Sequence, residues 1–247
     1  MKHTHTRPPS ATVISLIIFC FLYFLGVQTI SAQDQTANST GMSLGAKLLL
    51  NTSSFNDLTL QNERPHTEYK PGFGVGGYVL YSLSGNLSIQ SELLYFQQGG
   101  TLLAINFNDP LKNEITTSRI TLHNIEIPVL FQMNFPQLGG LFQPKIMLGG
   151  AVAYNIAAWE SFDKTIIYPV NNAITVYGTE NVSADYTPFQ FGAYVGIGVT
   201  SGALSVDLRY RHGINPVNAT YSLDNLINTG SDIQSHSVAM SIGLKIF

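Results

Sequence analysis

The sequence predicts an all-β protein, an eight-stranded antiparallel up-and-down β-barrel that spans a membrane. Three observations carry this prediction: an export signal at the N-terminus, apolar residues at every second position in eight segments, and connections that alternate between short and long. Only 11% of the 247 residues are charged, against the roughly 25% that is usual in soluble domains. The formal net charge is -3 and no basic run occurs, so the composition does not favour a nucleic-acid partner.

The N-terminus has the pattern of a secretory signal peptide. Lys2 and Arg7 precede an apolar run over 13–27, and small residues follow up to Ala32. The chain therefore divides into a signal peptide (1–32), which we expect to be cleaved, a polar linker (33–40) and a barrel domain (41–247). An uncleaved anchor helix is the alternative, because the apolar run is long for a signal. Cys20, the single cysteine, would leave with the signal, so the mature chain would form no disulfide.

Eight segments alternate between apolar and polar or small residues, as half-buried strands do. The expected strands lie near 42–50, 72–81, 87–97, 120–133, 144–156, 188–200, 204–213 and 236–247. Short turns follow the second, fourth and sixth of them, and long polar loops (51–71, 98–119, 157–187 and 214–235) follow the others. Short turns on one side and long loops on the other are typical of a transmembrane barrel.

The two faces of these strands differ in charge and in size. One face is apolar and carries no charge in any strand, and aromatic residues gather toward its ends. The other face carries the charged residues, separated by glycine, alanine and serine. Because eight strands leave an interior that side chains just fill, the small face suits the inside and the bulky face suits lipid. The alternative is a soluble periplasmic barrel that turns the apolar face inward and binds a small hydrophobic ligand or a lipid.

The strand in "SRITLHNIEIPVLFQMNF" has Glu126 and Pro128 among its polar positions. In a transmembrane barrel both side chains would point into the lumen, where Arg209 and Arg211 could neutralise the carboxylate. Proline lacks the N–H that a strand ladder uses, so we expect a bulge at Pro128. A bulge or a frayed end is also expected at the C-terminus, because the apolar parity there falls on Ile246 and not on Phe247.

Several stretches resemble the PorT-like outer-membrane β-barrel family. They are "KPGFGVGGYVLYSLSGNLSIQSELLYFQQGG", "LHNIEIPVLFQMNF", "MLGGAVAYNI", "FQFGAYVGIGVT" and "LSVDLRYRHGINPV", so the resemblance covers 41–247. Gly149-Gly150 is a departure, because the family pattern has Gly-Pro there. The resemblance implies a small β-barrel in the outer membrane of a Gram-negative bacterium, in contact with lipid. The family's namesake belongs to a protein-secretion system, but the fold alone does not transfer that role.

Candidate chemistry is sparse. A polar network is expected in the lumen, formed by Glu92, Glu126, Asp207, Arg209 and Arg211. It could form a proton or ligand path, but packed salt bridges that fill the lumen are the preferred interpretation. No catalytic, cofactor-binding or metal-binding residue is predicted, because the histidines of the barrel domain are scattered along the chain. Ser235-His236-Ser237 leaves an outer-membrane lipid hydrolase as a third possibility.

The loop over 157–187 is the best candidate for recognition, since exposed aromatic residues are what binding surfaces use. It carries Trp159, Phe162, Tyr168 and Tyr177. The alternative is that this loop folds over the barrel mouth as a lid. The sequence therefore predicts a non-enzymatic outer-membrane barrel, without a cofactor, that acts as a structural or interaction component of the envelope. Partners would be outer-membrane lipid and proteins of the envelope or of a secretion or surface complex.

Overall fold

The computed structural model describes residues 41–56, 68–109, 112–168, 173–217 and 233–247. The expected signal peptide and linker lie outside these residues, as does the expected cleavage after Ala32. In the described part of the chain, no helix has the length and apolar character needed to cross a membrane.

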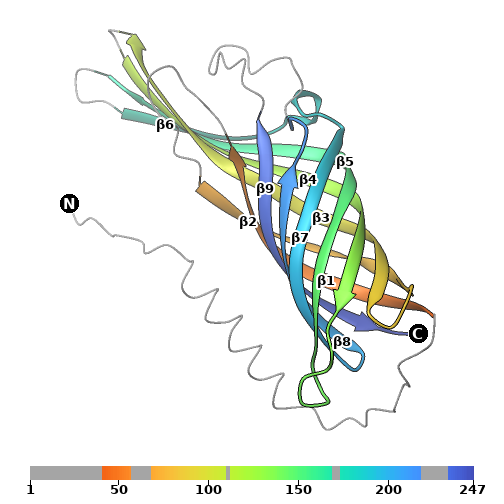
Figure 1. Ribbon diagram of the computed structural model, residues 1–247. Coiled ribbons are helices and arrows are strands. Elements are labelled where there is room, and N and C mark those ends of the chain that lie inside the picture. The colour runs from red at the N-terminus through yellow and green to blue at the C-terminus, as the bar shows by residue number, and fades with distance from the viewer. Residues whose placement is uncertain (1–40, 57–67, 110–111, 169–172, 218–232) are drawn as a thin grey trace. The chain divides into compact units, whose positions relative to one another are not determined.

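Nine antiparallel strands and one short 3-10 helix make up the described chain (Figure 1). They are β1 (Met42–Asn56), β2 (Glu68–Ser82), β3 (Leu87–Asp109), β4 (Lys112–Asn134), β5 (Gln143–Ile167), β6 (Ala173–Asn181), η1 (Ser183–Asp185), β7 (Phe189–Ser201), β8 (Leu204–Gly213) and β9 (Gln234–Lys245).

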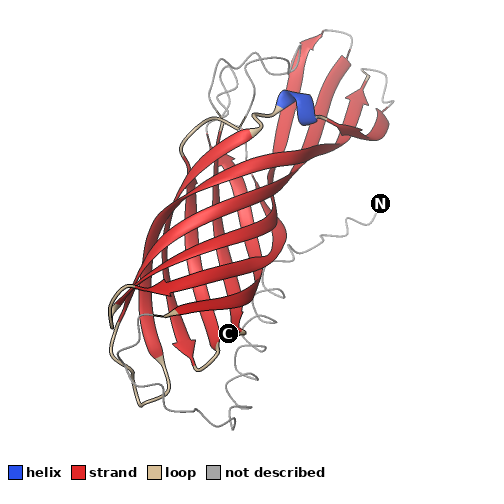
Figure 2. Cartoon of the chain, turned by 90° about the vertical axis from the view of Figure 1, so that its right-hand side faces the viewer, coloured by secondary structure: helices blue, strands red, loops and turns tan. Residues whose placement is uncertain are grey.

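Eight of the nine strands close into a ring, which confirms the predicted fold class. Each strand of the ring pairs with its neighbour in sequence once β6 is set aside, and β1 pairs with β9 to close the wall. The strands run obliquely around this wall (Figure 2). Closure pairs the backbone groups that an open edge would leave exposed, and lipid cannot satisfy those groups.

The two ends of the ring differ. At one end, here called the turn end, lie Met42, Lys245 and the short connections of β2–β3, β4–β5 and β7–β8. The β7–β8 turn is Gly202-Ala203, and Gly202 has a φ of +58°, a conformation that favours glycine. The opposite end, where β1 ends and β9 begins, is here called the loop end.

The prediction of long loops at 98–119 and 157–187 is wrong in large part, because β3, β4 and β5 continue as strands beyond the ring. β3 and β4 stay paired out to Asp109 and Lys112, and β5 continues to Ile167 before β6 returns antiparallel to it. The outer parts of β3 (102–109), β4 (112–118) and β5 (159–167), together with β6, form a four-stranded extension. We call it the projecting sheet (Figure 1).

Side chains in the ring point as a transmembrane barrel requires. The inward face buries charged and polar groups, whereas the outward face exposes large apolar side chains all around the wall. The outward side chains include Leu48, Phe73, Leu93, Phe131, Leu148, Ile197, Leu208 and Ile242. A soluble barrel with an apolar interior is therefore wrong, because an apolar exterior of this extent needs lipid rather than water.

Pro128 points inward and is buried as predicted, but the bulge expected there is absent. The β3–β4 ladder skips the pairs at Pro128 and Ile127 and resumes in the same register, and β5 pairs through Pro128 without a shift. The register shift lies farther up, where Ile156 is the extra residue of β5. The absence of an N–H at Pro128 thus removes hydrogen bonds from the β3–β4 ladder but does not shift the register of β4.

The irregular end expected at the C-terminus is present. The N–H groups of Ile246 and Phe247 both donate to the carbonyl of Leu44, at 2.8 and 3.3 Å. Two successive donors on one acceptor form a bulge-like step, so Phe247 rather than Ile246 lies opposite Leu44.

Candidate functional site

Five charged side chains form a buried cluster in the half of the lumen nearer the turn end, here called the charged network. Arg209 donates two hydrogen bonds of 2.8 Å to the two oxygens of Glu92, and Lys47 Nζ lies 2.6 Å from Glu92 Oε1. Asp207 lies 3.1 Å from Lys47 Nζ and 2.8 Å from Lys145 Nζ. All five side chains are 5% exposed or less. Three cations therefore share two carboxylates out of contact with water.

Glu126 and Arg211 form a separate pair farther toward the loop end. Arg211 Nε donates to Glu126 Oε1 at 3.0 Å, and Tyr194 donates to Glu126 Oε2 at 3.1 Å. Arg211 also donates to Ser235 Oγ at 3.2 Å and lies over the ring of Phe96. The five residues expected in one network are thus all buried in the lumen, but they belong to two clusters.

Amide side chains lie in the lumen above this pair, in one contact across the barrel and one between the adjacent strands β4 and β5. Gln98 donates across the barrel to Gln190 at 2.6 Å, and Asn155 donates to Asn124 at 3.2 Å. Along β4, the inward positions run from Leu122 through Asn124 to Glu126, so the amides separate the ion pairs from the residues at the loop end.

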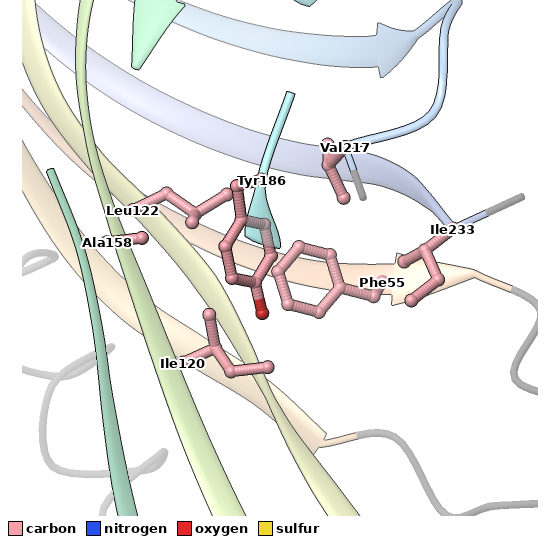
Figure 3. Close-up of a cluster of buried hydrophobic side chains, with 7 residues drawn as sticks. All are labelled: Phe55, Ile120, Leu122, Ala158, Tyr186, Val217 and Ile233. Atoms are coloured by element: carbon pink, nitrogen blue, oxygen red, sulfur yellow. The ribbon is translucent and has the colours of Figure 1, made fainter. Parts of the chain in front are cut away.

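An apolar cluster fills the lumen at the loop end, and we call it the apolar cap (Figure 3). Figure 3 shows the ring of Tyr186 next to that of Phe55, with Ile120 and Leu122 beside them. The cluster is Phe55, Ile120, Leu122, Ala158, Tyr186, Val217 and Ile233. Burial and the nearby carboxylates of Glu160 and Asp185 raise the pKa of the Tyr186 hydroxyl well above its usual value. The cap therefore stays uncharged in any physiological medium.

The lumen is thus filled along its length by ion pairs, amides and an apolar cap. Among the described residues, no three His, Cys, Asp or Glu side chains come together as a metal site. The charged side chains pair with one another and with nearby hydroxyl groups, as packed salt bridges in a filled lumen do.

The four residues predicted as a recognition loop lie on strands of the projecting sheet or at its end. Trp159 and Phe162 are on β5, Tyr168 directly follows β5, and Tyr177 is on β6. Tyr177 is 74% exposed and Trp159 is 44% exposed. Phe162 is only partly exposed, because its ring lies where a side chain at Gly178 would be. This ring covers the glycine and packs β5 against β6.

Part of the predicted loop does close the barrel, as the lid alternative expected. Tyr186 belongs to the apolar cap, and Val182 packs against it. The Val182 N–H donates to the carbonyl of Ala158 at 3.0 Å. The segment 157–187 therefore divides into a hairpin that extends away from the ring and a shorter stretch that covers its mouth.

β6 forms one edge of the projecting sheet. Within the described chain it pairs with β5 alone, over Ala173 to Asn181. Residues 173–179 carry no charge and no proline, which are the devices that usually protect an edge strand from pairing with other chains. Ile174 and Val176 are 52% and 46% exposed.

The Ser235-His236-Ser237 trio does not form a serine–histidine pair. Both serines are buried on the inward face, whereas His236 lies on the outward face with Tyr69 edge-on to its ring. Neighbours in a strand point to opposite faces, so adjacency in sequence separates these groups in space.

Three partners of the ion pairs were absent from the predicted set: Lys47, Lys145 and Tyr194. The two lysines were on the inward parity of the sequence, and that parity was the signal that could have included them. Tyr194 is on the inward parity as well, between Gly192 and Gly196, but parity does not reveal that its hydroxyl reaches Glu126 on β4.

Comparison with known proteins agrees with this architecture. Residues 32–218 match the model of a family described as outer membrane protein beta-barrel domain, and the chain belongs to that family. No curated protein sequence matches the chain significantly.

Solved outer-membrane barrels resemble the chain at low identity. Neisserial surface protein A is 12% identical, with a TM-score of 0.37, over 83% of this chain and 99% of that one. The outer membrane enzyme PagL is 11% identical, with a TM-score of 0.38, over 81% and 99%. Ail, the attachment invasion locus protein of Yersinia pestis, is 10% identical, with a TM-score of 0.35, over 84% and 100%. At this level of similarity no activity transfers to the chain.

Proposed function

We propose that this outer-membrane barrel is a non-enzymatic interaction component of the cell envelope that binds a partner protein through the projecting sheet. The single observation that carries the proposal is the sheet itself, which continues beyond the ring and exposes aromatic and aliphatic side chains. The filled lumen supports it, because a barrel blocked by ion pairs and an apolar cap is unsuited to general transport.

The exposed residues of the projecting sheet are of the type that protein interfaces use. Trp159, Tyr168 and Tyr177 offer large rigid surfaces with a polar group, which are enriched at the centres of interfaces. β6 adds an edge that pairs with no further strand in the described chain, so an extended segment of a partner can pair with it. The exposed aromatic side chains and the β6 edge together form a recognition surface that the barrel ring supports.

The resemblance to PorT-like barrels supports a partner from a secretion or surface complex. In outer-membrane barrels the short turns face the periplasm and the long connections face the outside. With that orientation the projecting sheet would lie outside the cell, where it could contact secreted or surface-anchored proteins.

Site-specific photo-crosslinking in intact cells tests the proposal. A crosslinker at Tyr177 on the projecting sheet should capture one protein in stoichiometric amount. A crosslinker at Tyr81, which is also outward-facing but lies at the turn end, is the matched control and should not capture it. A barrel that gives the same products from both positions, or none from Tyr177, would contradict an interaction role.

A deacylation assay tests the proposal that the barrel is not an enzyme. The folded barrel should not deacylate lipid A or phospholipid. Deacylation that disappears in His236→Ala while the barrel stays folded would replace the proposal with a lipid hydrolase.

A further inference from the structure

Two histidines that are distant in sequence are direct neighbours on the barrel wall. His212 of β8 and His236 of β9 are partners in the antiparallel ladder. Both face outward, because Arg211, Ser235 and Ser237 beside them are buried in the lumen. Residues directly opposite in such a ladder have Cβ atoms about 4.5–5.5 Å apart, which brings two imidazoles within reach of one ion.

Aromatic neighbours orient both rings. Tyr69 stands edge-on to His236, with ring centroids 5.8 Å apart and an interplanar angle of 87°. Tyr210 stacks on His212, with centroids 6.4 Å apart and an angle of 24°. Rings fixed by packing lose less freedom when they bind a ligand, so the pair is preorganised.

The neighbours of the pair on the adjoining strands carry short side chains, although Ser54 on the β1 side is itself buried. The cross-strand neighbour of His212 on β7 is Ala193, and that of His236 on β1 is Ser54. Both are small. His212 is next to the last residue of β8 and His236 is near the start of β9, so the pair lies at the loop end of the wall, close to the boundary with water.

His236 also has an unused bonding group. Its Nδ1 atom is buried and has no hydrogen-bond partner among the described residues. His123, another outward-facing histidine near the loop end, differs in this respect, because its Nδ1 atom lies 2.6 Å from the Tyr95 hydroxyl. A buried nitrogen atom without a hydrogen-bond partner destabilises the folded protein, and a metal ion bound to that nitrogen would remove this cost.

We propose that His212 and His236 form a site for a transition-metal dication such as Cu²⁺ or Zn²⁺. Neutral imidazole is a preferred ligand of both ions and is the dominant form above about pH 6.5. Zinc–imidazole bonds of about 2.0–2.1 Å fit two side chains held on adjacent strands. Water completes the coordination, since no third His, Cys, Asp or Glu joins the pair in the described chain. The site does not depend on the proposed recognition role of the projecting sheet.

Copper binding to the folded barrel tests this proposal. The protein is purified from outer membranes without an affinity tag and titrated with Cu²⁺ in detergent micelles at neutral pH, and the ion is followed by electron paramagnetic resonance. We expect one tightly bound Cu²⁺ with hyperfine structure from two imidazole nitrogens. Zn²⁺ should displace it, and acidification to about pH 5 should release it, because protonated imidazole cannot bind.

Single substitutions identify the ligands. His212→Gln and His236→Gln should each weaken binding at least about tenfold, because loss of an outer-shell partner alone costs roughly 10–100-fold. The double variant should bind little more weakly than either single one, since one ligand gives no chelation.

His123→Gln is the matched control and should bind as the unchanged protein does. Mobility of unheated samples on SDS gels shows that each variant is folded. An unchanged affinity in folded His212→Gln or His236→Gln, or an equal loss in His123→Gln, would overturn the proposal.

Discussion

At the scale of single residues, two adjacent glycines in β5 have very different surroundings. A Cβ added to Gly149 would lie 2.9 Å from both the Leu130 Cα and the Val129 carbonyl carbon, and these backbone atoms cannot move aside. A Cβ added to Gly150 would meet only the Gly192 carbonyl oxygen, at 3.6 Å, an ordinary contact. The inward glycine is therefore needed for close approach of β4 and β5.

This difference gives a first prediction. Gly149→Ala should destabilise the folded barrel by roughly 1–3 kcal/mol, because it overpacks the wall. Gly150→Ala should change the free energy of unfolding by less than about 0.5 kcal/mol. Urea titration in lipid vesicles, with the folded fraction read from unheated SDS gels, measures both. Equal midpoints for the two variants would contradict the clash.

The charged network gives a second prediction. Glu92→Gln removes the carboxylate that Arg209 and Lys47 share and leaves both cations buried without it. Breaking a buried pair in this way costs about 3–5 kcal/mol, so this variant should unfold at much lower urea than the unchanged protein. Glu180→Gln on exposed β6 is the matched control and should have little effect. A Glu92→Gln barrel as stable as this control would mean that water reaches the network.

At the scale of elements, β5 and β6 form a hairpin that joins the ring at its base, and in the described chain its outer part pairs only with the outer part of β4. Glu160 and Glu180 are directly paired near that base, and the pairing continues outward to Ile167 and Ala173. The hairpin also pairs along β4 outside the ring. Folding of the ring should therefore not require the outer part of the hairpin.

A deletion tests this third prediction. Residues 161–179 are removed and the paired residues Glu160 and Glu180 are joined by a two-residue Asn-Gly turn, which suits a hairpin. The shortened protein should fold and keep its heat-dependent mobility on SDS gels. Because the deletion removes Tyr177 and most of β6, the stoichiometric partner should no longer be recovered with it. Failure to fold, or undiminished recovery of the partner, would contradict the separation of ring and projecting sheet.

The strands were predicted only where they lie in the ring, and the reason is physical. Lipid on one side and a polar lumen on the other impose strict alternation on each strand of the wall. Beyond the wall neither face needs to be apolar, so 112–118 and 173–179 lose the alternation although β-branched residues remain frequent. A prediction based on alternation therefore ends β3 and β5 too early and begins β4 too late.

At the scale of the whole molecule, the lumen is obstructed at several levels. The apolar cap fills the loop end, and amides and two clusters of ion pairs lie beneath it. Removing one level should therefore not open a channel.

This obstruction gives a fourth prediction. The unchanged protein should show no conductance of porin size in planar bilayers. The double variant Phe55→Ala/Leu122→Ala should not show it either, because it thins the cap and leaves the charged network intact. A known porin reconstituted in the same bilayers is the positive control. Porin-size conductance from the unchanged protein would refute a closed lumen.

The sequence by itself determined the closed barrel and the side of the wall on which each residue lies. Period-2 alternation assigns a face to every residue of a strand, and an eight-stranded interior has room only for the small and charged face. The inward placement of Glu92, Glu126, Asp207, Arg209 and Arg211 follows from this parity alone.

Only the tertiary structure decided which of these side chains meet. Ring closure and strand register place Glu92 against Arg209 and Glu126 against Arg211 and Tyr194, and parity contains no information about distance across the lumen. Register also brings His212 beside His236. The projecting sheet depends on pairing as well, because its strands are held by ladders to one another and not by an apolar face that the sequence would reveal.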